Sequence, residues 1–254
     1  MEHRTERDPA GERRAPAGAC DAVQAARAIG RCPACLLTIV FVLVIVAPPI
    51  ARSQAPAPRP GGDRHGRLFP PNDLGLLEGP DRDLWQKPDL IMDALGIADG
   101  AVVADIGAGG GWFTIRLARR VGPNGVVYAE DVQREMLQAI DRRVQREGLR
   151  NVHTVKGERE DPRLPDSSLD AALIVDVYNE FTNPVAMLRS VARALRPHGR
   201  IGVVNFKKGG GGPGPPPEER VDASAVAADA KAAGLRVVAR ESFLPYQYLL
   251  VLGK

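Results

Sequence analysis

The sequence predicts an α/β fold: a doubly wound, mostly parallel sheet with helices on both faces. Between residues 101 and 206, short apolar runs alternate with amphipathic segments of helical periodicity, which is typical of parallel strands joined by right-handed crossover helices. A glycine-rich loop follows the first apolar run, as in folds where a strand turns into a helix beneath a ligand. The last two apolar runs have no helix between them, so we expect an antiparallel pair at the sheet edge.

The first 33 residues are predicted to be disordered. They are rich in Arg, Ala, Gly and Pro and show no sustained periodicity, a composition that buries too little apolar surface to fold. All three cysteines fall within the first 35 residues, and Cys32 and Cys35 form a CPAC pair. Because the neighbouring sequence has no second Cys or His pair, we interpret CPAC as small residues opening an apolar segment rather than as a redox or metal motif.

An apolar segment, residues 34–51, comes next. Its apolar run, residues 34–47, carries no charge and lies between Arg31 and a Pro-rich stretch. This is the pattern of a secretory signal peptide. A membrane-spanning helix needs about 20 apolar residues, so a cleaved signal and a retained anchor both stay open. Either one predicts export, to the periplasm or to the membrane, which the chain would contact through this segment only. A Pro/Gly-rich linker, residues 52–80, leads to the globular domain, residues 81–254.

Strands and helices alternate along that domain. Apolar runs of strand length indicate buried parallel strands at 101–106, 125–130, 171–177 and 200–206. Apolar residues at helical spacing predict helices at 112–120, 134–147 and 184–195. The C-terminal part is predicted to form a helix at 223–233 and strands at 235–239 and 246–252.

The most informative motif is the loop within VVADIGAGGGWFTIRLA, residues 102–118. Glycines at 107, 109 and 111 let the backbone turn tightly and approach a ligand, and the loop amides with the helix N-terminus offer donors to a polar or anionic group. A dinucleotide site needs GxGxxG, which would put the third glycine where Trp112 stands. A purely structural turn is the alternative interpretation of such a loop taken alone.

An acidic pair, Glu130 and Asp131, closes the second strand about twenty residues after the loop. A carboxylate at this point can accept hydrogen bonds from both hydroxyls of a ribose. Alternation along a strand points neighbouring side chains to opposite faces. We therefore expect only one of the two acids to face the ligand.

Together these segments resemble the class I, Rossmann-like S-adenosylmethionine-dependent methyltransferases, in particular a branch that acts on small molecules. The GxGxG loop resembles the family's first motif, and VVYAEDVQREML is similar to its VYAVDIxPEML pattern. The resemblance implies a seven-stranded sheet and an S-adenosylmethionine site in which Asp131 binds the ribose, with Glu130 as the alternative. It also implies that the first motif contributes Asp105, Gly107, Ala108, Gly109 and Gly111.

Two further segments extend the resemblance to residue 206. GEREDPRLPDSSLD, from residue 157, is similar to the family's GDAEDLPFPDxSFDxV, which implies that Glu158 contacts the adenine amino group and that the backbone amide of Arg159 contacts the ring. The order DPRLP departs from the family's pattern, so Asp161 is an alternative to Glu158. ALRPHGRIGVVNF resembles LKPGGRLxxxxF and marks a structural turn after a helix.

The fourth strand ends in DVYNEF, residues 176–181, where this branch of the family usually carries a histidine in place of Asn179. In doubly wound folds the carboxyl ends of the strands face the ligand, so Asp176, Tyr178 and Asn179 are the candidates for contact with the methyl acceptor. A place in the core for Tyr178 and helix capping by Asp176 are the structural alternatives. Methyl transfer does not demand a base, because positioning of an activated donor supplies much of the rate.

Composition and missing motifs exclude several function classes. The net charge of +3 and the aromatic content of 5% provide neither the dense basic face nor the stacking platform of nucleic-acid binders. The sequence has no HExxH, GxSxG or P-loop motif, so metalloprotease, hydrolase and NTPase chemistry lacks its reactive groups. We expect no metal and no nucleic-acid partner.

The function that the resemblance implies is methyl transfer from S-adenosylmethionine to a small-molecule acceptor. Asn179 in place of the usual histidine favours a second hypothesis, a module that binds this cofactor without catalysis, and a nicotinamide-dependent oxidoreductase is a third. The Gly/Pro-rich insertion 207–219 follows the fifth strand. We expect it to be a flexible linker, with a lid over the site as the alternative.

Overall fold

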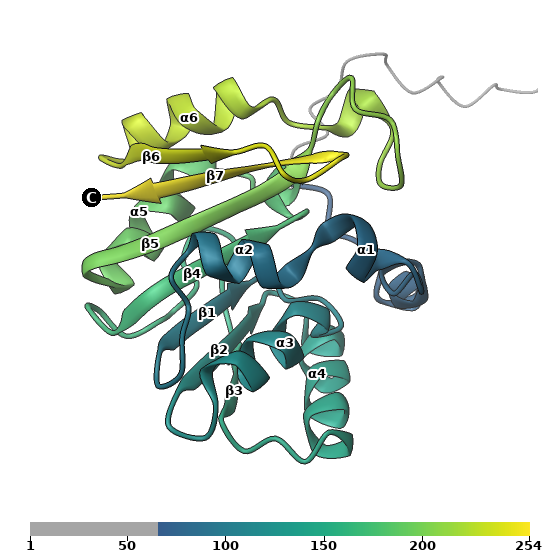
Figure 1. Cartoon of the computed structure of the whole chain (residues 1–254), viewed down its shortest axis with the longest axis vertical. Coiled ribbons are helices and arrows are strands. Elements are labelled where there is room, and N and C mark those ends of the chain that lie inside the picture. The colour runs from purple at the N-terminus through teal and green to yellow at the C-terminus, as the bar shows by residue number, and fades with distance from the viewer. Residues whose placement is uncertain (1–65) are drawn as a thin grey trace, which may run out of the picture. The chain divides into compact units, whose positions relative to one another are not determined.

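The computed structural model describes residues 66–254, which fold around a seven-stranded sheet (Figure 1). The strand order is β3-β2-β1-β4-β5-β7-β6. Strands β1 to β5 run parallel, whereas β7 runs antiparallel to both β5 and β6, which confirms the predicted sheet and its antiparallel edge. The strands are β1 (Val102–Ile106), β2 (Val126–Asp131), β3 (Val152–Lys156), β4 (Leu169–Val175), β5 (Leu195–Phe206), β6 (Arg236–Glu241) and β7 (Gln247–Gly253).

Four of the helices begin at the predicted residue and end within one residue of the predicted end. Side-chain caps explain two of these starts: Asn183 accepts a hydrogen bond from Ala186 N, and Asp222 accepts one from Ser224 N. The α-helices are α1 (Arg82–Gln86), α2 (Pro88–Ala94), α3 (Trp112–Val121), α4 (Arg134–Arg146), α5 (Pro184–Ala194) and α6 (Ala223–Ala232). Short 3-10 helices are η1 (Pro71–Leu77), η2 (Tyr178–Glu180) and η3 (Pro217–Glu219).

The central strands of the sheet are buried on both faces, because they alternate their side chains between two apolar clusters. On β1, Ala104 and Ile106 join the cluster formed with α5 and α6, while Val103 joins the cluster formed with α2 and α3. Figure 1 shows α2 and α3 covering the near face of the sheet. Helix α4 packs against β2 and β3. Burial of both faces is what the near-continuous apolar runs predict.

Two strands differ from the sequence prediction. Strand β3 was not predicted, because His153 and Lys156 interrupt its apolar pattern and it lies half-exposed at the sheet edge. Strand β5 starts at Leu195, where we expected the helix to end and a turn to follow. Leu169 pairs with Leu195 but Ala171 already pairs with Arg200, so the residues expected in the turn form a bulge within the strand.

Residues 66–80, which the sequence analysis placed in a linker, pack against the carboxyl ends of the strands. Gly66 N donates to Asn179 O at 3.3 Å. Phe69 N donates to Glu180 Oε2 at 3.0 Å, and Gln133 Nε2 donates to Phe69 O at 3.0 Å. The Pro/Gly-rich composition gives no sign of this packing, because the segment is held by hydrogen bonds to its backbone groups and not by an apolar side-chain pattern.

Several predictions concern residues outside the described part of the chain. The disordered segment 1–33, the apolar segment 34–51, the cysteines and the first part of the linker all fall there, so they stay predictions. Within residues 66–254, none of the helices has the length and apolar character needed to cross a bilayer. The same residues contain no cluster of acidic, His or Cys side chains suited to a metal ion.

Candidate active site

The loop between β1 and α3 is fastened to the end of β2. The amide of Gly107 donates to Glu130 Oε2 at 3.2 Å, and the amide of Gly109 donates to Asp131 Oδ2 at 3.0 Å. Both glycines have a positive φ, of 65° and 55°, and a Cβ at Gly107 would lie within 2.6 Å of a neighbouring side chain. This conformation therefore requires glycine.

A cavity of about 660 Å³ opens at the carboxyl ends of β1, β2 and β4, the edge at which doubly wound sheets bind ligands. Four of the five residues predicted from the first motif line it: Asp105, Gly107, Ala108 and Gly109. The fifth, Gly111, is instead the N-cap of α3 with φ 78°, and a Cβ there would press against α4. Gly111 therefore serves packing rather than the cavity wall.

Asp105 is the next-to-last residue of β1, just before the loop. Its Oδ2 accepts a hydrogen bond from Thr114 Oγ1 at 2.7 Å, which ties the strand to the first turn of α3. Burial raises the pKa of this carboxyl to about 6, although the Thr114 hydroxyl and the Arg82 guanidinium both act to lower it. A carboxylate with a raised pKa inside a cavity is a common feature of functional sites.

Both acids at the end of β2 line the cavity. Asp131 is 6% exposed and accepts hydrogen bonds from Gly109 N and, at 2.8 Å, from Gln133 N. Glu130 is 2% exposed, and its Oε1 has no hydrogen-bond partner within the described residues. Burial, and then the nearby Asp131 charge, raise the pKa of Glu130 to about 8.

The expectation that only one of the two acids would face the site is therefore wrong, because both line the cavity. Asp131 is the last residue of β2, and its carboxylate accepts a hydrogen bond from the amide of Gln133, two residues further along the chain. Both acids are still paired with β3, Glu130 with Val155 and Asp131 with Lys156, and both carboxylates accept from amides of the glycine loop at this end of the sheet. Alternation along a strand gives the face of a side chain, but it does not show whether that side chain borders a cavity at the end of the sheet.

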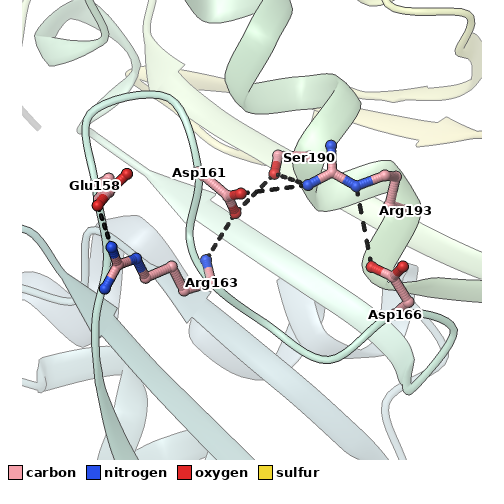
Figure 2. Close-up of polar contacts among 6 residues, drawn as sticks. All are labelled: Glu158, Asp161, Arg163, Asp166, Ser190 and Arg193. Carbon is pink, nitrogen blue, oxygen red and sulfur yellow. Dashed lines mark hydrogen bonds and ion pairs between the residues drawn. The ribbon is translucent and has the colours of Figure 1, made fainter.

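The two acids proposed for the adenine amino group point away from the cavity. Figure 2 shows the side chain of Glu158 paired with Arg163, and that of Asp161 directed at Ser190 and Arg193 on α5. Asp161 accepts from Ser190 Oγ at 2.8 Å and from Arg163 N at 2.9 Å. Neither Glu158 nor Asp161 lines the cavity, because these arginine pairs hold both carboxylates at the surface.

Arg159 lines the cavity, and its side chain makes a contact that the sequence did not predict. Its Nη1 donates to Gly66 O at 3.1 Å, so the guanidinium holds the start of the described chain against the site. The backbone amide that the resemblance assigned to the adenine ring stays a prediction.

The three candidates after β4 separate in the structure. Asp176 and Asn179 line the cavity, whereas Tyr178 is 0% exposed and lies in the core beside α5 and α6. Tyr178 Oη donates to Asp229 Oδ2 at 2.9 Å, and burial raises its pKa. Contact of Tyr178 with an acceptor is therefore wrong, and the core position named as its alternative is confirmed. Asp176 does not cap a helix, since the 3-10 helix η2 is preceded by Val177.

Sequence reasoning missed a buried polar network beside Asp176. Gln86, at the end of α1, and Gln247, at the start of β7, both donate to the Asp176 carboxylate, at 3.0 Å and 2.6 Å. Arg82 Nε donates to Gln86 Oε1. Burial lowers the pKa of Arg82 even though Asp176 and Asp105 lie near it. The sequence contains only one sign of this network, the glutamine Gln247 in an otherwise apolar strand. Single glutamines are too common in strands to indicate a site.

Trp112 occupies the position that argued against a dinucleotide site. Two guanidinium groups lie against its ring, Arg82 at 4.2 Å and Arg116 at 3.4 Å from the ring centroid. Arg116 also pairs with Asp83 on α1 at 2.7 Å. These contacts hold α1 over the start of α3, so α1 forms part of the cavity wall.

Aromatic and proline side chains form another part of the wall. The ring centroids of Trp85 and Phe206 lie 5.7 Å apart, and the insertion contributes residues 213–216 beside them. Arg220 fixes the insertion: it is 7% exposed and donates to three backbone carbonyls, those of Pro215, Lys207 and Gly211, at 2.8 to 3.0 Å. The insertion is therefore part of the cavity wall, as in the lid interpretation.

Comparison with known proteins agrees with this architecture. Residues 103–199 match the family model described as a methyltransferase domain. The ubiquinone/menaquinone biosynthesis C-methyltransferase UbiE of Pasteurella multocida is 34% identical over 131 residues, covering 49% of this chain and 46% of the relative. The chain thus spans about half the length of the curated relatives it matches.

Solved structures extend the similarity over most of the described residues. A SAM dependent methyltransferase from Aquifex aeolicus superimposes with a TM-score of 0.70 at 30% identity, covering 73% of this chain and 98% of its own. The [4+2]-cyclase SpnF superimposes with a TM-score of 0.58 at 18% identity, over 66% of this chain and 80% of its own. The likeness to the cyclase concerns the fold alone, because one fold hosts many reactions.

Proposed function

Because the chain belongs to the class I S-adenosylmethionine-dependent methyltransferases, we propose that it methylates a carbon atom of an apolar aromatic hydroxy compound, such as a hydroquinone. Family membership rests on near-complete coverage of a solved methyltransferase at 30% identity and on the matching domain model. Methyl transfer with this donor follows from membership. The proposal therefore concerns two further points: the chemical class of the acceptor, and methylation at a carbon atom.

The glycine loop and the end of β2 fit the donor. Gly107 and Gly109 hold a tight positive-φ turn in the cavity wall, and Glu130 Oε1 is a buried oxygen without a partner in the described residues, as expected where a ligand completes the hydrogen bonding. Asp131 would bind the ribose hydroxyls and the loop would bind the amino-acid end. The bound donor supplies a methyl group on a positively charged sulfur.

The aromatic wall next to the polar network is the observation that carries the acceptor proposal. Trp85 and Phe206 give a planar ring two aromatic partners, while Asp176 lies in the same cavity to receive a hydroxyl group. A few polar groups among apolar ones are what small-molecule sites use to fix orientation. The relatives named as ubiquinone/menaquinone C-methyltransferases support a quinol-type ring.

Label transfer tests the proposal. The full-length protein is incubated without oxygen with methyl-tritiated S-adenosylmethionine and a reduced benzo- or naphthohydroquinone, and the products are extracted into organic solvent. We expect a labelled product in the organic phase with the new methyl group on a ring carbon, identified by NMR. An O-methyl ether would contradict the carbon assignment, and label confined to water-soluble or protein products from cell extract would contradict the acceptor class.

A further inference from the structure

Asp176, the residue after β4, combines an unusual backbone conformation with a place in the cavity wall. Its φ is 58°, in the left-handed region that residues other than glycine adopt rarely and that concentrates at functional sites. Its N–H donates to Val204 O at 2.9 Å, which holds this conformation against the neighbouring strand β5. The strained backbone is thus maintained by the sheet itself.

Two glutamines from distant parts of the chain orient the carboxylate of Asp176. Gln86 Nε2 donates to Oδ2 at 3.0 Å, and Gln247 Nε2 donates to Oδ1 at 2.6 Å. Gln86 Nε2 also lies 3.1 Å from Gln247 Oε1, and both glutamines are 0% exposed. Each carboxylate oxygen can accept two hydrogen bonds, so each retains capacity for a hydroxyl donor in the cavity.

The electrostatic surroundings make Asp176 a proton acceptor suited to neutral pH. Burial raises its pKa to about 6, while Arg82 and the two glutamine amides act to lower it. Besides Arg82 on α1, the titratable Tyr248 on β7 interacts with it, and Asp105 on β1 interacts with the same guanidinium. A base works best when its pKa lies near the working pH.

We infer that Asp176 is the general base that takes the proton of the acceptor's hydroxyl group, and that Gln86 and Gln247 are its positioning residues. The inference rests on the proposed hydroxyaromatic acceptor.

Asp105 and Glu130 also line the cavity, but their carboxylates bond the start of α3 and the glycine loop, on the donor side. Glu180 on η2 lines the cavity as well, but its Oε2 accepts a hydrogen bond from Phe69 N at 3.0 Å and so holds the segment before α1. Asp176 is the carboxylate directly after β4, where an acceptor is expected.

The acceptor's O–H bond breaks, its proton passes to Asp176, and its electron pair is delocalised into the ring. The ring carbon beside the oxygen then bonds to the methyl carbon, while the carbon–sulfur bond breaks and its electron pair stays on sulfur. The methylated carbon loses its hydrogen as a proton to water, and the oxygen regains a proton from Asp176. The carboxylate is regenerated and one proton is released. Arg82 offers a positive charge near the oxygen anion.

Asp176→Asn tests the base directly, because it keeps the shape and removes the proton acceptor. In single-turnover methyl transfer at pH 7, the full-length variant is expected to lose at least about 100-fold in rate, with its Kd for S-adenosylmethionine within about threefold of wild type. The rate of the variant should then climb roughly tenfold per pH unit toward the pKa of a free phenol, about 10, while the wild-type rate stays level. Asp166→Asn, at a side chain that is 76% exposed, is the matched control and should behave as wild type.

Gln247→Leu tests the positioning role and remains informative if Asp176→Asn fails to fold. Loss of the amide raises the pKa of Asp176, because this hydrogen bond lowers it, so the acidic limb of the rate–pH profile should move to higher pH. A structural role alone would lower the rate without moving that limb. If the acidic limb does not move in Gln247→Leu, or if Asp176→Asn keeps the wild-type rate at pH 7, this inference is wrong while the proposed function still stands. A wild-type protein that labels no hydroxyaromatic compound overturns the proposed function, and this inference with it.

Discussion

Glu130→Gln should change how the stability of the protein depends on pH. Glu130 is 2% exposed, one carboxylate oxygen lacks a partner in the described residues, and Asp131 follows it in the chain. Glutamine has nearly the same shape, can accept the hydrogen bond from Gly107 N, and does not ionise. The substitution therefore removes a titration while leaving the packing almost unchanged.

The size of the effect follows from the pKa of Glu130, which rises from 4.5 to about 8, mainly through burial. An acid whose pKa is raised in the folded state stabilises the fold fully below pH 4.5 and loses this contribution as the pH rises through 8. Between pH 5 and pH 7 the loss from Glu130 amounts to about 2.5 kcal/mol. Wild type should lose that much more stability than Glu130→Gln over the same interval.

Urea denaturation at pH 5, 6 and 7, followed by tryptophan fluorescence without ligand, measures this difference. Glu135→Gln is the control, because Glu135 is exposed on the first turn of α4 and should leave the wild-type pH dependence unchanged. Parallel curves for wild type and Glu130→Gln would refute the reasoning, since they would mean that Glu130 is already ionised at pH 5 in the folded protein.

Asp131→Ala is expected to weaken S-adenosylmethionine binding at least tenfold, because charge-assisted hydrogen bonds contribute about 1.5–3 kcal/mol each; an unchanged Kd by calorimetry would place the ribose elsewhere. Tyr178→Phe should cost about 1 kcal/mol of stability through the lost bond to Asp229 and leave kcat unchanged, and a large fall in kcat would argue against its core position. The apolar segment 34–51 predicts export, so fractionation of native cells should recover the protein from periplasm or membrane; recovery of the unprocessed chain from the cytoplasm alone would contradict this.

The sequence by itself determined the sheet apart from its edge strand β3, together with the glycine loop and the acidic pair at the end of β2. Each of these features is local: a run of apolar residues, a loop and the next helix follow one another along the chain, and their order fixes which strand ends meet. Gly107, Gly109 and Asp105 could be assigned to the cavity because covalent continuity places them directly after a buried strand. Family resemblance pointed to the same residues for the same reason.

The limits of local information show at Glu158, Asp161 and Tyr178. All three follow strands and occupy positions where a ligand contact is expected. Their side chains instead bond to other residues: Glu158 to Arg163, Asp161 to Ser190 and Arg193, and Tyr178 to Asp229. Sequence spacing gives the position of a Cα but not the direction in which a polar side chain finds its partner. That direction depends on which charges the folded chain brings near it.

Only the tertiary structure decided the acceptor side of the site. Gln86 and Gln247 reach Asp176 across 90 and 71 residues of sequence, and Arg82 enters from a helix that the periodicity did not predict. A buried carboxylate must gather hydrogen-bond donors from any element within reach, and contacts of this kind leave no regular spacing in the chain. The donor side of the site consists of residues that are consecutive in the sequence, whereas the acceptor side forms only when α1, β4 and β7 pack together.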